Sequence, residues 1–197
     1  MKIILASQSP RRRELLERMG ISEFEIIPAR GEENIVPGLT PEALVEALSR
    51  QKCLEVAAVH REALVIAADT VVAVEGRVLG KPRSKAEAEE MLSLLSGREH
   101  RVCTGLSLSQ GGRLRTGHEA TAVRFRPLTR EEIRRYVSTG EPMDKAGAYG
   151  IQGYGCLLVE GIVGDYYNVM GLPVCRLGRM LAEFGADPLA ALGDKEG

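Results

Sequence analysis

The chain has 197 residues, with 26 Lys and Arg against 27 Asp and Glu, which gives a formal net charge of −1. This length predicts one domain, or two small lobes that share a core. Balanced charge argues against a general binder of nucleic acid or of membrane surfaces, because both need a net basic field. Aromatic residues make up only 4% of the chain, and tryptophan is absent. An aromatic platform for single-stranded nucleic acid is therefore not expected.

Targeting signals and the usual zinc-binding patterns are absent from the sequence. The N-terminal apolar run is too short for a signal peptide, and no stretch of about 18 apolar residues predicts a membrane span. The three histidines lack zinc-ligand spacing. None of the four cysteines forms a CxxC pair, so no redox or zinc motif of that kind is expected: Cys53, Cys103, Cys156 and Cys175. Their spacing and the size of the chain fit buried or half-buried reduced thiols, so we expect a cytoplasmic protein.

The first half of the chain alternates strand and helix patterns. A short buried strand over 2–6 precedes a helix that begins at Pro10 with Ser9 as its cap and ends near Met19. A strand over 24–28 and a helix over 41–60 follow. The next predicted elements are a buried strand over 64–68 that ends at Asp69-Thr70, a hairpin over 71–79 and a capped helix over 84–97.

The second half adds hairpins to the same mixture. Strands are predicted over 102–109 and 117–125, and a capping box at Thr129 begins a helix that ends near Ser138. A glycine-rich stretch, 140–155, precedes a closing hairpin of 156–162 with 166–169 and a last helix from Pro173 to about Phe184. Because hairpins interrupt the alternation, we predict a mixed-sheet α/β protein.

The segment between the first strand and helix predicts an anion site. Ser7, Ser9 and three consecutive arginines, 11–13, lie where free backbone N–H groups and the positive end of the helix dipole collect. Guanidinium groups suit phosphate. The alternative is an ordinary capped helix with solvated arginines, and spacing alone favours neither.

Asp69 follows the apolar strand, and Thr70 follows Asp69. Binding crevices of α/β sheets lie beyond the carboxyl ends of strands, where a carboxylate could hold Mg²⁺ or deprotonate water. The alternative is an Asp that begins a turn. Val71-Val72 continue the strand pattern, so the acid lies in an extended apolar context and is expected to have a partner or a function.

Lysines and a glutamate pair are weaker signals. Lys52 lies in the apolar stripe of its predicted helix, where it could snorkel to solvent or point at an anion. Lys81 lies at the tip of a predicted turn. Glu32-Glu33 precede a Gly/Pro-rich loop, and near a phosphate they could complete a metal site.

The stretch Gly140–Gly155 holds five glycines in sixteen residues. Glycine lets backbone approach a flat ligand closely. Gln152 could bind a nucleobase edge, because its amide both donates and accepts. The alternative is a long surface loop, although loops of this length are usually functional or disordered.

Five segments together resemble the Maf family of nucleoside triphosphate pyrophosphatases, over roughly residues 3–184. They are LASQSPRRRELL at 5–16, AADTVV at 67–72, LGKPRS at 79–84, GEPMDKAGAYGIQG at 140–153 and YYNVMGLPV at 166–174. The last two segments are most similar to the branch that acts on dTTP and UTP.

The resemblance implies an elongated mixed sheet with flanking helices, similar to inosine triphosphate pyrophosphatases, with two lobes around a central cleft. It implies hydrolysis of a nucleoside triphosphate to monophosphate and pyrophosphate with Mg²⁺ or Mn²⁺. From the sequence pattern we expect one domain over 1–188 and a loose tail over 189–197. A homodimer is expected from family habit. The resemblance implies that Asp69 is the catalytic carboxylate and that Asp69 and Glu33 bind the metal. The positions that it implies for substrate choice are Arg11, Thr70 and Gln152. The positions that it implies for phosphate binding are Ser7, Arg11, Arg12, Lys52 and Lys81.

Two alternatives stay open at this level. The substrate could be a modified nucleotide such as 5-methyl-UTP, pseudo-UTP or 7-methyl-GTP. The chain could instead be a nucleotide-binding regulator of septum formation, although a water-activating carboxylate favours an enzyme. The sequence does not decide among general base, metal ligand or both for Asp69.

Overall fold

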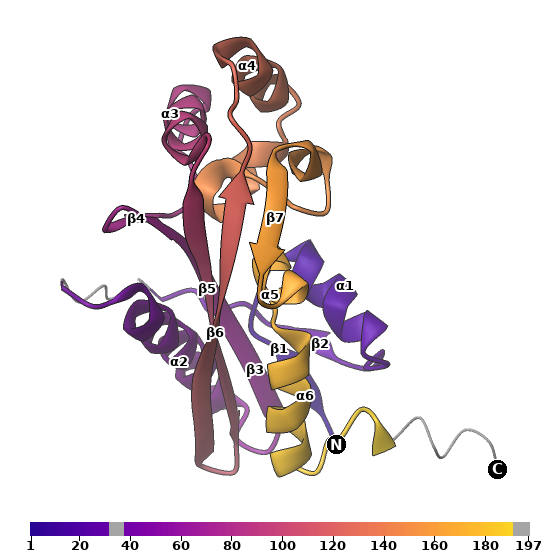
Figure 1. The fold of residues 1–197 in the computed structure, drawn as a ribbon. Helices are drawn as coiled ribbons and strands as arrows, with labels where there is room; N and C mark the ends of the chain where they lie inside the picture. The colour runs from indigo at the N-terminus through magenta and orange to yellow at the C-terminus, as the bar shows by residue number, and fades with distance from the viewer. Residues whose placement is uncertain (32–37, 191–197) are drawn as a thin grey trace. The chain divides into compact units, whose positions relative to one another are not determined.

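A computed structural model describes residues 1–31 and 38–190 (Figure 1). Among these residues, seven strands form one mixed sheet in the order β2-β1-β3-β5-β6-β7, with β4 paired to β3. No described helix is long and apolar enough to cross a membrane. The chain divides into two compact units: unit 1 is Met1–Asp69, Thr104–Glu119 and Gly171–Gly197, and unit 2 is Thr70–Cys103 and Ala120–Met170.

The described part of unit 1 contains three helices, α1 (Pro10–Arg18), α2 (Pro41–Val59) and α6 (Val174–Glu183). The hydroxyls of Ser9 and Thr40 accept the backbone N–H three residues further on at the starts of α1 and α2. Proline occupies the first position of both helices, where no N–H is needed. The three helices predicted for these segments are confirmed.

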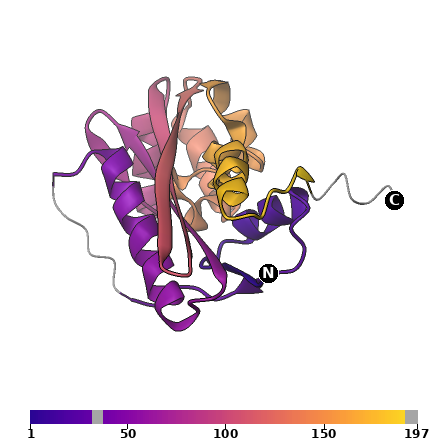
Figure 2. The same ribbon diagram turned by 90° about the horizontal axis from the view of Figure 1, so that it is seen from below.

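The strands of unit 1 lie between helices. β1 (Ile3–Leu5) pairs in parallel with β2 (Glu25–Ile26) and with β3 (Leu64–Val74). β5 (Glu99–Gln110) and β6 (Arg113–Phe125) continue the sheet. The strands β3, β5 and β6 each have residues in both units. Figure 2 shows α2 on one face of these strands and α1 with α6 on the other. The core on the α2 face includes Ile4, Ala6, Cys53, Val56, Val65 and Ala67.

Unit 2 contains β4 (Arg77–Leu79), β7 (Val159–Val163), α3 (Lys85–Leu95), α4 (Arg130–Ser138) and α5 (Tyr166–Met170). The predicted capping box at the start of α4 is present: the Thr129 hydroxyl accepts the N–H of Glu132, and the Glu132 carboxylate accepts the N–H of Thr129. β4 is antiparallel to β3, and β7 is antiparallel to β6. The fold class predicted from the sequence, a mixed sheet with flanking helices, is confirmed.

Two predicted strand boundaries are wrong. β3 does not end at Asp69-Thr70 but continues to Val74 without a break. The strand predicted from Cys156 begins only at Val159, because Tyr154–Leu157 form a 3₁₀ turn, η3.

The strand predicted over Tyr166–Val169 is also wrong, because these residues form α5. The Asp165 carboxylate accepts the N–H of Tyr167 at 2.8 Å and turns the chain. The buried amide of Asn168 then donates to Val102 O and Thr121 Oγ1, both at 2.9 Å. These partners are more than forty residues away in sequence, so the aromatic β-propensity of the segment is overridden by tertiary contacts.

Candidate functional site

The turn between β1 and α1 has the geometry that the sequence predicts for an anion site. Ser7 is buried, and its Oγ accepts the N–H of Ser9 at 3.2 Å. Ser9 Oγ in turn accepts the N–H of Arg12. Since α1 begins here, its positive dipole end lies at this turn.

Arg12 joins three parts of unit 1. Its Nε donates to Gly171 O at 2.8 Å, and one terminal nitrogen donates to Ala68 O at 2.8 Å and Ser7 Oγ at 3.2 Å. Burial lowers the pKa of the guanidinium, the Asp69 carboxylate raises it, and Arg11 lowers it. The side chain stays protonated, because an arginine pKa begins far above neutral pH. Arg12 therefore holds a fixed positive charge close to Asp69 and anchors the backbone around it.

Lys52 and Asp69 form an ion pair between α2 and β3. Lys52 Nζ lies 2.5 Å from Asp69 Oδ1, and the two side chains are 22% and 15% exposed. The snorkelling alternative for Lys52 is wrong, because its ammonium points at the carboxylate. The turn alternative for Asp69 is wrong as well, since the residue lies inside β3. The expectation that this acid has a partner is confirmed.

The structure brings Ser7, Arg12, Lys52 and Asp69 together within unit 1, and Arg11 adjoins them in α1. Phosphate oxygens can be bound by the Ser7 hydroxyl, the Arg12 guanidinium and the Lys52 ammonium. The Asp69 carboxylate can hold a water. Glu33, the second predicted metal ligand, lies outside the described residues.

The three other predicted residues belong to unit 2. Thr70 is half-buried and follows Asp69 in β3, while Lys81 and Gln152 are exposed. Gly147 N–H donates to Gly80 O at 3.0 Å, so the glycine-rich stretch is hydrogen-bonded next to Lys81.

The glycine-rich stretch forms three 3₁₀ turns, η1 (Glu141–Asp144), η2 (Ala146–Ala148) and η3. Its glycines allow close packing within the chain. A Cβ on Gly153 would lie 2.3 Å from Glu141 Oε2, and one on Gly150 would lie 2.5 Å from Lys145 Cε. The prediction that these glycines serve close approach to a ligand stays a prediction, because intramolecular contacts already account for them.

Sequence reasoning missed Tyr136 and Glu141. Tyr136 Oη donates to Glu141 Oε1 at 2.8 Å, and the Glu141 carboxylate accepts two backbone N–H groups of the glycine-rich stretch. A signal existed, since a compact glycine-rich turn has many backbone N–H groups that need acceptors. Glu141 is a carboxylate at the start of that stretch and is therefore one of the acceptors that could bind them.

Comparison with known proteins identifies the family of this chain. The sequence profile of the family described as Maf-like protein matches residues 2–184. The chain belongs to the Maf family.

The relatives of this Maf-family chain include two bacterial proteins named dTTP/UTP pyrophosphatase. The one from Moorella thermoacetica is 56% identical over 188 residues, which cover 94% of this chain and 96% of the relative. The one from Carboxydothermus hydrogenoformans is 56% identical, with coverage of 94% and 100%. A solved HAM1 protein from Coxiella burnetii has the same fold, with a TM-score of 0.51, 16% identity and coverage of 93% and 99%.

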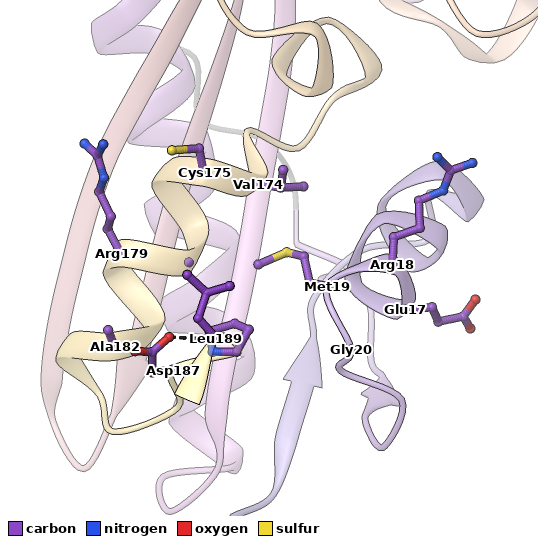
Figure 3. Close-up of a pocket in the computed structure, with 12 residues that line it drawn as sticks. Glu17, Arg18, Met19, Gly20, Val174, Cys175, Arg179, Ala182, Asp187 and Leu189 are labelled. Atoms are coloured by element: carbon purple, nitrogen blue, oxygen red, sulfur yellow. Dashed lines mark hydrogen bonds between the residues drawn. The ribbon is translucent and has the colours of Figure 1, made fainter. Parts of the chain in front are cut away.

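A cavity of about 580 Å³ lies elsewhere in unit 1 of this Maf-family chain, between the end of α1 and α6. Figure 3 shows Met19 and Val174 among its lining side chains. The twelve lining residues include none of the predicted site residues. Since the nine residues of α1 rise about 13 Å, the cavity lies at the opposite end of that helix from the Ser7–Arg12 turn.

Proposed function

We propose that this chain hydrolyses dTTP and UTP at the α-phosphorus, releasing the nucleoside monophosphate and pyrophosphate. The observation that carries the proposal is the Lys52–Asp69 ion pair beside Arg12. It places a carboxylate of β3 next to a cation from α2 and a cation from α1. The names of the Moorella and Carboxydothermus relatives support the choice of substrate.

In the proposed reaction, a water oxygen bonds to the α-phosphorus, and the bond from this phosphorus to the bridging oxygen breaks. Pyrophosphate leaves with the bridging oxygen, and the proton from water passes to Asp69. Lys52 and Arg12 bind phosphate oxygens as negative charge moves onto the leaving group. Ser7, Arg11 and Lys81 are the further phosphate ligands, and Thr70, Gln152 and Arg11 select the substrate.

A divalent cation, Mg²⁺ or Mn²⁺, is part of the proposal. Among residues 1–31 and 38–190, no three His, Cys, Asp or Glu side chains gather as a metal site. Mg²⁺ at phosphate-transfer sites is commonly bound by one or two carboxylates and by the substrate phosphates. Asp69 fits that donor set, with Glu33 as the second proposed ligand. When bound, the cation would neutralise charge on the phosphate oxygens.

The test is pyrophosphate release from a panel of triphosphates with Mg²⁺. We expect dTTP and UTP to react fastest among dTTP, UTP, CTP, ATP, GTP, 5-methyl-UTP, pseudo-UTP and 7-methyl-GTP. In ¹⁸O-labelled water, attack at the α-phosphorus puts the label in the monophosphate. No release from dTTP or UTP contradicts the proposed substrates, and label in the pyrophosphate contradicts the site of attack. Because free nucleotides are the substrate, we place the activity in the cytoplasm.

A further inference from the structure

Gln152 lies at the third position of a tight turn in unit 2. Gly153 N–H donates to Gly150 O at 3.2 Å, which closes the four-residue turn Gly150–Gly153. The side chain of Gln152 is exposed, whereas Ile151 beside it is buried. The direction of the amide therefore depends on what holds the two ends of this turn.

Tyr136 holds the first end. The N–H of Gly150 donates to Tyr136 Oη at 3.1 Å, and Tyr136 Oη donates to Glu141 Oε1 at 2.8 Å. Tyr136 is only 6% exposed. Its hydroxyl thus accepts from the turn and donates to the carboxylate at the same time.

Glu141 holds the second end. Its Oε2 accepts the N–H of Tyr154 at 2.8 Å, and its Oε1 accepts the N–H of Gly155 at 3.0 Å. The Glu141 carboxylate occupies the space that a side chain at position 153 would need, since a Cβ on Gly153 would be 2.3 Å from Oε2. Hydrogen bonds from N–H groups to an ionised carboxylate are stronger than those to a neutral acceptor.

A third contact fixes the residue before the turn. Tyr149 Oη lies 2.8 Å from Nε2 of the buried His100, and its ring packs edge-on against Phe125 at 4.7 Å between centroids. The backbone on both sides of Gln152 is thereby tied to a buried or half-buried side chain of unit 2.

We infer that the Tyr136–Glu141 pair positions Gln152, and through it selects the base of the nucleotide. The inference rests on the proposed function for the role of Gln152. Tyr136 and Glu141 are positioning residues, because they bond to the backbone of the turn and act through the Gln152 amide.

The test combines enzyme kinetics with amide hydrogen exchange on the full chain. Tyr136→Phe removes one hydroxyl and keeps the ring, and Glu141→Gln keeps the size of the side chain. We expect faster exchange at the amides of Gly150, Tyr154 and Gly155 in both variants, without added nucleotide. We also expect about a tenfold rise in KM for dTTP, the value of one lost hydrogen bond, with kcat changed less. Preference for dTTP over CTP should fall by a similar factor.

A double-mutant cycle with Gln152→Ala separates positioning from general damage. If Tyr136 acts through Gln152, Tyr136→Phe should change kcat/KM for dTTP by less than twofold in the Gln152→Ala background. Tyr166→Phe, at an exposed tyrosine of α5, is the matched control and should leave exchange and kinetics unchanged.

Multiplicative effects of the two substitutions would overturn the inference, as would unchanged exchange at the three amides. If the native chain releases no pyrophosphate from dTTP or UTP, the proposed function fails. In that event exchange still reports on the turn, so the two failures are distinguishable.

Discussion

The ammonium of Lys52 lies 2.5 Å from Oδ1 of Asp69, and each side chain has most of its surface withdrawn from solvent. A carboxylate in an apolar strand is thus held by a cation from the neighbouring helix. Partial burial strengthens the electrostatic interaction, because less water screens it. The same pairing orients the carboxylate, which leaves its second oxygen, Oδ2, as the one that we propose faces the attacking water.

Asp69→Asn tests the role of that carboxylate. The amide keeps the size of the side chain but cannot take a proton from water, so pyrophosphate release from dTTP should fall by about 10² or more. Glu62→Gln, at an exposed glutamate just before β3, is the matched control and should keep the native rate. A near-native rate for Asp69→Asn, with native circular dichroism, would remove Asp69 from the mechanism.

Arg12→Lys and Arg13→Lys separate a buried anchor from its exposed neighbour. A lysine cannot reproduce the fork with which Arg12 bonds Ala68 O and Gly171 O together. We expect a loss of about 1–3 kcal/mol in the free energy of unfolding, measured in urea, for Arg12→Lys. Among residues 1–31 and 38–190, the Arg13 side chain pairs only with the exposed Glu17, so Arg13→Lys should change stability by less than about 0.5 kcal/mol. Equal losses in the two variants would contradict the anchoring role of Arg12.

Local signals explain which parts of the fold the sequence could predict. The caps at Ser9, Thr40, Ser84 and Thr129 are all present, and each accepts the N–H three residues on. A cap and the helix that it begins are adjacent in sequence, so the predicted helix starts agree with the structure. The failure at Tyr166–Val169 has the opposite cause, since Asn168 bonds to partners on β5 and β6.

The candidate site was predictable as a set of residues but not as a geometry. Lys52 and Asp69 are 17 residues apart in different elements, and spacing gave no reason to pair them. Tyr136 and Glu141 were missed because their role is to bond backbone N–H groups rather than to present a reactive group. The positions of Lys81 and Gln152 in substrate binding stay predictions.

Two glycine substitutions should have opposite signs. Gly147 has φ +68°, and a Cβ there would lie 2.7 Å from Val72 Cγ2. Gly147→Ala should therefore lower the melting temperature, since it adds both backbone strain and a collision with a buried strand. Gly178 lies inside α6, and no atom of the described residues is within 4 Å of an added Cβ, so Gly178→Ala should stabilise by about 0.5–1 kcal/mol. Differential scanning calorimetry of the two variants checks both signs, and a Gly147→Ala protein as stable as the native chain would contradict the collision.

His100 should make stability depend on pH in the mildly acidic range. It is 2% exposed, its Nδ1 has no hydrogen-bond partner among the described residues, and burial lowers its pKa from 6.5 to about 4. Between these values the unfolded chain binds a proton that the folded chain does not, so stability falls as pH falls from 6.5 to 4. This difference in pKa between the unfolded and the folded chain corresponds to about 3 kcal/mol of stability.

The variant His100→Gln tests this dependence, because it keeps a neutral group that can bond Tyr149 Oη but removes the titration. Urea denaturation from pH 4.5 to 7.5 should give a smaller pH dependence for His100→Gln than for the native chain, by about 2–3 kcal/mol across the range. Parallel curves would mean that His100 does not carry this dependence.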